Sequence, residues 1–232
     1  MFWQHHGVEK KDLLVPGSIL LGAVIIAVSI CWSVAKISPD SVAAANLNQG
    51  LVPVPGQKIL VDTRKDAPKL GNGKIEIIEF TDFQCPFCQQ FFNQTYSQIK
   101  SKYINTGKAV LTIRHFPLVQ LHKNAQKASE AAECANRQGK FFPYHDLLFA
   151  KMQPDGTGLN IADLKRYALD LGLDTTRFNQ CLDKGETASA VKADLEAGQK
   201  AGVTGTPTFF INGEKVVGAL PFAAFETVIE KF

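Results

Sequence analysis

The sequence of 232 residues has few cysteines and almost no excess of charge. Five cysteines are too few for a small scaffold built on disulfides, so each needs its own explanation. The formal net charge is only +3 and no basic stripe interleaved with aromatics is visible, so we expect no nucleic acid as a partner. Glycine (18) and proline (11) are too few for collagen-like or low-complexity chains, and no internal repeat is visible. Apolar residues make up 45% of the chain, enough for a globular core.

One long apolar run lies near the N-terminus, where residues 13–35 contain no charge. A helix over this run would extend roughly 34 Å, and a bilayer core is about 30 Å thick. We therefore predict a transmembrane helix or signal anchor. A cleaved signal peptide is the alternative, because Ala43 and Ala45 form an A-x-A pattern. Two lysines precede the run and one follows it, which predicts a cytoplasmic tail over 1–12 and an exported C-terminal body.

The next segment, residues 36–69, is predicted to be an extracytoplasmic linker. It contains several prolines, glycines and asparagines and shows little hydrophobic periodicity. Its short apolar run Lys58–Val61 is interpreted as a small edge strand. Since disulfides persist outside the cytoplasm, the exported cysteines can pair there.

The rest of the chain, 70–232, alternates between strand and helix patterns. An apolar, β-branched strand is followed by a short motif with two cysteines and a helix that extends to about residue 102. The strands are predicted over 74–81, 108–116, 208–211 and 215–217. The later helices are predicted over 122–138, 141–152, 161–171, 175–184, 186–201 and 222–232. This order is β-α-β, an all-helical block over about 122–203, then β-β-α, which predicts an α/β fold with a helical insertion.

The motif Cys85-Pro86-Phe87-Cys88 lies between the first strand and its helix. Free N–H groups and the helix dipole stabilise a thiolate at a helix start, and in such motifs the thiol pKa falls to between roughly 3.5 and 7. Pro86 suits the first turn of a helix. A spacing of three residues allows Cys85 and Cys88 to form a disulfide. We expect Cys85 to be the exposed attacking thiol and Cys88 to be the buried resolving thiol, with Pro86 and Phe87 tuning the reaction.

Two other interpretations of this cysteine pair stay open at this stage. It could be half of a zinc site, but Cys134 and Cys181, the remaining exported cysteines, are 47 residues apart and form no second pair of the same spacing. It could also be a structural disulfide, although so short a loop gains little stability from closure. We favour redox chemistry and expect neither a metal nor a cofactor.

Together with two further segments, the motif resembles the DsbA-like thiol:disulfide oxidoreductases of the thioredoxin superfamily. Residues 205–211, Gly-Thr-Pro-Thr-Phe-Phe-Ile, are similar to the cis-proline loop of that family, and residues 114–118, Arg-His-Phe-Pro-Leu, end the second strand in a similar way. The resemblance covers about 70–232. It implies a thioredoxin fold with an all-helical insertion between the second and third core strands.

The resemblance also assigns roles to individual residues. Pro207 would be cis and face the cysteines, so that Thr206 binds an extended substrate segment; a trans proline at a strand start is the alternative. Glu79 would be a buried acid that exchanges protons with Cys88, rather than a strand residue that faces solvent. Cys134 and Cys181, both in the predicted insertion, are expected to form a second disulfide; two buried thiols are the alternative. Phe87 stands where such oxidases often have a histidine.

We therefore expect an oxidoreductase that introduces disulfides into exported, cysteine-containing proteins while anchored in the membrane by a single span. The resemblance implies a quinone-linked membrane partner that reoxidises it. Two alternatives remain open: a disulfide isomerase or reductase of the same fold, and a chaperone-like module that binds unfolded exported proteins.

Overall fold

The computed structural model describes residues 58–232. The predicted tail 1–12, the predicted membrane span 13–35 and the linker up to residue 57 lie outside the described residues. Within 58–232, no helix combines the length and the apolar character that a membrane crossing requires.

A mixed sheet of five strands forms the centre of the described part, in the order β1-β3-β2-β4-β5. Strands β2 and β3 are parallel, and every other neighbouring pair is antiparallel. Asn212 and Gly213 both have positive φ angles in the turn between β4 and β5, as the predicted two-residue hairpin requires. The strands are Lys69–Gly71 (β1), Ile75–Thr81 (β2), Ala109–His115 (β3), Thr208–Ile211 (β4) and Glu214–Val217 (β5).

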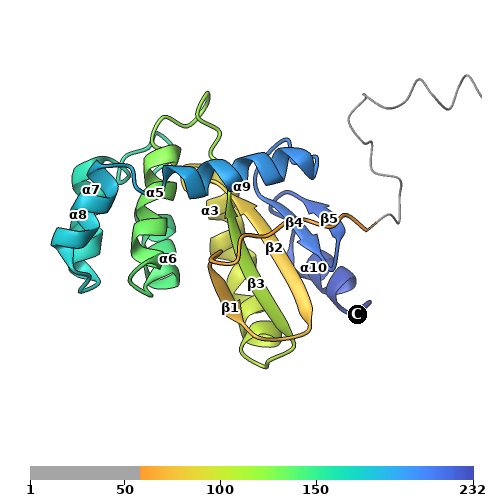
Figure 1. The fold of residues 1–232 in the computed structure, drawn as a ribbon. Coiled ribbons are helices and arrows are strands. Elements are labelled where there is room, and N and C mark those ends of the chain that lie inside the picture. The colour runs from red at the N-terminus through yellow and green to blue at the C-terminus, as the bar shows by residue number, and fades with distance from the viewer. Residues whose placement is uncertain (1–57) are drawn as a thin grey trace, which may run out of the picture. The chain divides into compact units, whose positions relative to one another are not determined.

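Helical segments follow β2 and fill the interval between β3 and β4. The first is continuous from residue 86 to 104 and comprises Pro86–Phe91 (α3), Phe92–Tyr96 (η1), Ser97–Ile99 (α4) and Lys100–Ile104 (η2), of which η1 and η2 are π-helical. The insertion contains Ala125–Asn136 (α5), Phe141–Lys151 (α6), Ile161–Asp170 (α7), Thr175–Asp183 (α8) and Ala188–Lys200 (α9). Helix α10, Phe222–Ile229, follows the sheet. Helices α5 to α8 gather beside the sheet, and α9 returns to it (Figure 1). The predicted thioredoxin fold with its helical insertion is thus confirmed.

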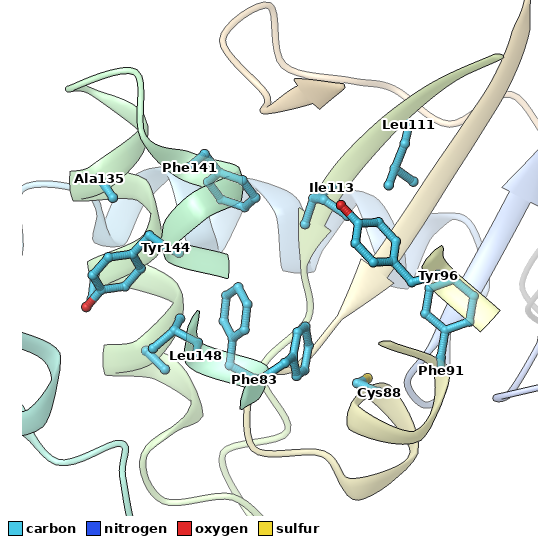
Figure 2. Packing of buried hydrophobic residues seen from close by; sticks show 14 of the residues in the cluster. Phe83, Cys88, Phe91, Tyr96, Leu111, Ile113, Ala135, Phe141, Tyr144 and Leu148 are labelled. Atoms are coloured by element: carbon cyan, nitrogen blue, oxygen red, sulfur yellow. The ribbon is translucent and has the colours of Figure 1, made fainter. Parts of the chain in front are cut away.

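The two faces of the sheet have separate apolar cores. Because successive strand residues point to opposite faces, Ile77 and Ile78 lie in different clusters. The larger cluster joins the face of Ile77 to the helix after β2, to α10 and to the insertion, and Figure 2 shows its aromatic side chains packed around Cys88 and Phe83. The smaller cluster lies under α9, where a Cβ on Gly198 would come within 2.7 Å of the Phe116 ring. Glycine therefore lets α9 approach the sheet closely.

The predicted boundary of the linker is wrong for residues 58–69. Lys58–Val61 is not a strand and makes only one backbone hydrogen bond to the sheet region, from Ile59 to Gly213. The strand forms later, at Lys69–Gly71, where three residues pair with β3. Ile59 and Val61 also pack against the smaller core. This segment is therefore part of the folded domain, because its apolar side chains find partners there.

A buried ionic network fastens the same segment to the insertion. Arg64 bonds to Asp194 of α9 at 2.7 Å and to Glu133 of α5 at 2.5 Å, and Arg114 of β3 bonds to Asp194 at 2.6 Å. Burial opposes ionisation of Glu133, but hydrogen bonding from His115 and the charge of Arg64 outweigh it and lower its pKa to about 2. His115, Glu133 and Asp194 have metal-ligand atoms within 4.8 Å of one another, but the two arginines already neutralise the carboxylates.

Candidate redox site

The dithiol motif lies at the junction of β2 and α3. Cys85 has extended backbone angles and is the N-cap residue of α3, and Pro86 begins the helix. The helix start therefore presents its free N–H groups to the Cys85 sulfur, as the sequence predicted. Both Cys85 and Cys88 are free thiols in this structure.

Cys85 is not exposed, contrary to our expectation. Its residue is only 3% accessible, against 0% for Cys88, although Phe87 between them is 61% accessible. The cover comes from a distant loop, because the Cys85 sulfur lies 3.3 Å from the backbone carbonyl oxygen of Thr206, to which the thiol donates. Both thiols are therefore buried, and Cys88 is the deeper of the two, in the expected order.

Hydrogen bonding to the charged sulfur lowers the pKa of Cys85 from 9.0 to about 6. The Cys88 thiol is the largest cause, since it donates to the thiolate; burial opposes this effect. The Thr206 hydroxyl and the backbone N–H groups of Cys88 and Phe87 lower the pKa further. The Thr206 hydroxyl has no other partner among the described residues, so it is available to the ionised sulfur. At pH 7 the thiolate is therefore the main form.

Cys88 and Glu79 have shifts in the opposite direction. Burial raises the pKa of Cys88 well above 9.0, and the hydrogen bond with Cys85 and the charges of Cys85 and Glu79 raise it further. Burial also raises the pKa of Glu79 to about 8, and the nearby Thr81 hydroxyl opposes this shift. Glu79 is therefore an acid inside the protein, and the alternative of a strand residue facing solvent is wrong. Thr81, which contributes to both pKa values, was not identified from the sequence.

The loop before β4 forms the opposite wall of the site. The Thr206–Pro207 peptide bond is cis, the geometry that the resemblance assigned to Pro207. A hollow of about 380 Å³ lies beside it and is bordered by Phe87, Gln90, Gly205, Thr206, Pro207, Val217, Gly218 and Ala219. Two apolar side chains that border this hollow, Phe87 and Val217, are exposed. The hollow therefore offers exposed apolar surface beside Thr206, the residue that contacts the Cys85 sulfur.

The other two described cysteines form a disulfide within the insertion. Cys134 of α5 and Cys181 of α8 are joined, with their Cα atoms 6.0 Å apart. This is the pairing expected from the sequence, and it removes both residues from any zinc site. The disulfide links two helices of the insertion and contributes no group to the redox site.

A mixed sheet, a cysteine pair at a helix start and a cis-proline loop define a dithiol protein of the thioredoxin fold. Residues 70–231 match the family model described as thioredoxin, and the chain belongs to this family.

Solved structures with this fold include DsbA-type proteins. The chain resembles the oxidised BdbD of Bacillus subtilis with a TM-score of 0.68 and 23% identity, covering 74% of this chain and 95% of BdbD. Its TM-score with alpha-DsbA1 of Wolbachia pipientis is 0.60 at 27% identity, covering 78% and 92% of the two chains. With Chlamydia trachomatis DsbA the TM-score is 0.64 at 19% identity, and the match covers 76% of this chain and 96% of that protein. The likeness to BdbD and to the Chlamydia protein carries the fold alone.

Curated relatives are much longer proteins. The Na(+)/H(+) antiporter NhaA 3 of Salinispora tropica is 34% identical over 179 residues, which are 77% of this chain and 25% of the relative. The Na(+)/H(+) antiporter NhaA 1 of Mycobacterium sp. strain KMS is 29% identical over 218 residues, 91% of this chain and 33% of the relative. The chain thus spans about a quarter to a third of the length of these relatives.

Proposed function

We propose that this protein is a thiol:disulfide oxidoreductase that introduces disulfides into exported proteins through Cys85 and Cys88. The observation that carries the proposal is the opposite shift of the two thiols, with the Cys85 pKa lowered to about 6 and the Cys88 pKa raised by burial. The likeness to alpha-DsbA1 of Wolbachia pipientis, at 27% identity, supports an oxidoreductase activity.

The reaction begins with the Cys85–Cys88 disulfide. A substrate thiolate attacks the Cys85 sulfur, a mixed disulfide forms, and Cys88 leaves and takes up a proton, which Glu79 can supply because its raised pKa keeps it protonated near pH 7. A second substrate thiolate then attacks the substrate sulfur of the mixed disulfide. Cys85 leaves as a stable thiolate, the substrate has lost two electrons to the enzyme, and the lowered pKa of Cys85 favours this step.

The direction of exchange follows from the same thiolate. With a pKa of about 6, the Cys85 thiolate is about ten times more populated than the thiol at pH 7. This stabilises the reduced form by about 1.4 kcal/mol, or about 30 mV, relative to an unshifted thiol. Net oxidation is therefore the proposed direction. An isomerase or reductase is the alternative, because Phe87 offers no charge of its own to the thiolate.

Substrate binding would use the hollow beside Pro207. The Thr206 backbone lies beside Cys85, with its carbonyl oxygen 3.3 Å from the sulfur. An extended substrate strand could pair with this backbone by β-augmentation, while Phe87 and Val217 contact its apolar side chains.

The cellular setting is also part of the proposal. Residues 13–35 would anchor the protein as a single-pass membrane protein with its catalytic domain outside the cytoplasm, as a charge-free run of that length suggests. A quinone-linked membrane partner would reoxidise the dithiol after each turnover. A second disulfide between Cys134 and Cys181 suits such an oxidising compartment.

The test is oxidation of a reduced, unfolded protein that contains two cysteines. The oxidised wild type is expected to transfer its disulfide to this substrate, whereas Cys85→Ala abolishes the transfer. Failure of the wild type to oxidise the substrate would reject the proposal. The double variant Cys85→Ala/Cys88→Ala separates the chaperone-like alternative, since continued suppression of substrate aggregation by this variant would favour binding without exchange.

A further inference from the structure

Asp82 is a buried carboxylate three residues before Cys85, and hydrogen bonds occupy both of its oxygens. Oδ1 accepts from the Gln84 backbone N–H at 2.7 Å. Oδ2 accepts from the Leu118 backbone N–H and from His122 Nδ1, both at 2.8 Å. The Asp82 carbonyl also accepts from the Cys85 N–H at 3.1 Å. One residue therefore joins the turn that carries Cys85 to the segment that follows β3.

Gln84 makes a second connection between the same turn and the insertion. Its Oε1 accepts from the Asn124 backbone N–H at 2.9 Å, and Asn124 Nδ2 donates to the Gly156 carbonyl at 2.9 Å. Gly156 has a φ of +86°, and a Cβ there would lie 2.7 Å from Gln84 Nε2. The two residues on either side of Phe83 are thus both fixed to the insertion, at separate points.

Burying the Asp82 carboxylate between the Cys85 turn and the segment after β3 is unfavourable by itself. Burial removes a carboxylate from water, and its hydrogen bonds must replace those that water would make. Three donors in a fixed arrangement, however, define the orientation of a turn more sharply than an apolar side chain does. The segment that they hold is compact, because the N–H groups of Leu121 and His122 both donate to the Leu118 carbonyl, at 2.8 and 2.9 Å.

We propose that Asp82 is a positioning residue for Cys85, with His122 as its support. This inference rests on the proposed redox function. Closing the Cys85–Cys88 disulfide requires the Cys85 sulfur to stay near Cys88, and a fixed turn raises the effective concentration of one thiol at the other. If the hydrogen bonds of Asp82 are lost, the turn is no longer fixed, and the equilibrium for disulfide closure shifts towards the open dithiol.

The test is the equilibrium constant for closing this disulfide in glutathione buffers, measured by trapping free thiols with an alkylating reagent. Asp82→Asn keeps the size of the side chain and can still accept from Gln84, but it places an amide NH₂ opposite the Leu118 and His122 donors. We expect the constant to fall about tenfold, which corresponds to about 30 mV.

Asp146→Asn is the control, since Asp146 accepts from His145 Nδ1 at 2.8 Å in another Asp–His pair but has no hydrogen bond to residues 82–85. His145 meets that turn through ring packing on Phe83, with centroids 5.7 Å apart, which the substitution leaves in place. The constant of this control is expected to stay within twofold of wild type. A value for Asp82→Asn within twofold of wild type, or an equal fall in Asp146→Asn, would overturn the inference.

If Asp82→Asn does not fold, the same equilibrium constant measured for His122→Ala tests the inference. His122 is a partly exposed side chain that supplies one of the three donors, so its removal is milder. We expect a fall of about threefold, and an unchanged constant would again overturn the inference. Because closure is measured without any substrate protein, these results stay distinct from a failure of the wild type to oxidise its substrate.

Discussion

The Cys85 sulfur lies 3.3 Å from the carbonyl oxygen of Thr206, a residue 121 positions further along the chain. The two residues come from opposite sides of the insertion, and the sheet brings them together because β2 and β4 are neighbours. Helix and loop thus act on one sulfur from two directions, the helix through its N–H groups and the loop through its hydroxyl and carbonyl groups.

Thr206→Val tests the contribution of the hydroxyl. Valine keeps the shape of threonine but cannot donate to the thiolate, so we expect the pKa of Cys85 to rise from about 6, by about one unit. Ultraviolet absorbance of the thiolate, recorded against pH, gives the midpoint. Thr208→Val is the control, since the Thr208 hydroxyl donates to the Gly205 carbonyl at 2.7 Å instead. An unchanged midpoint in Thr206→Val would show that the hydroxyl has no role.

The raised pKa of Glu79 predicts that the folded protein loses stability as the pH rises. Burial raises its pKa from 4.5 to about 8 in the folded protein, so between these values the folded state holds a proton that the unfolded state has released. The stability present below about pH 4.5 is therefore lost as pH rises towards 8, by roughly 3–5 kcal/mol.

The Cys85→Ala background suits this measurement, because the lowered pKa of Cys85 acts with the opposite sign. Urea unfolding at several pH values would give the slope, and adding Glu79→Gln should flatten it. A slope that persists with glutamine would assign the effect to another group.

Removal of the Cys134–Cys181 disulfide should reduce stability without removing activity. A loop of 47 residues corresponds to about 4 kcal/mol in the chain-entropy model. We expect Cys134→Ala/Cys181→Ala to unfold at a lower denaturant concentration, while Cys85 keeps its thiolate midpoint. A changed midpoint would indicate that the insertion disulfide communicates with the redox site, contrary to its position in the structure.

Arg64→Ala should destabilise the domain by about 3–5 kcal/mol, because it removes the partner of buried carboxylates on Asp194 and Glu133. Arg166→Ala is the control: its guanidinium is mostly exposed and bonds to Asp163 at 2.7 Å, and such pairs contribute about 0–1 kcal/mol. Thermal unfolding of both variants gives the comparison. Equal, small effects would mean that the segment around Arg64 is only loosely attached.

The sequence predicts local features of this protein well and distant ones poorly. The helix start at Pro86 and the Asn212–Gly213 hairpin depend on a few adjacent residues, and both are present. The burial of Cys85 was not predicted, since it depends on Thr206. Strand β1 was also missed, because a strand of three residues has too short a pattern to recognise.

Asp82 and Arg64 show the same limit within the polar interior. The bond from Asp82 to the Gln84 N–H is an Asx turn, which the residues Asp-Phe-Gln before a helix could have indicated. Its bonds to Leu118 and His122, however, span 36 and 40 positions. The buried partners of Arg64, Glu133 and Asp194, lie 69 and 130 positions away, so no local sequence pattern indicates them.

The anchoring of the redox turn to the insertion also bears on protein engineering. The insertion occupies a single interval between β3 and β4, which makes it look like an interchangeable cassette. Yet Asp82 and Gln84 bind to its leading segment, and Gly156 leaves room for one of them. A chimera with a foreign insertion would need residues in that insertion that bind Asp82 and Gln84. Without them, the turn that carries Cys85 would lose these hydrogen bonds.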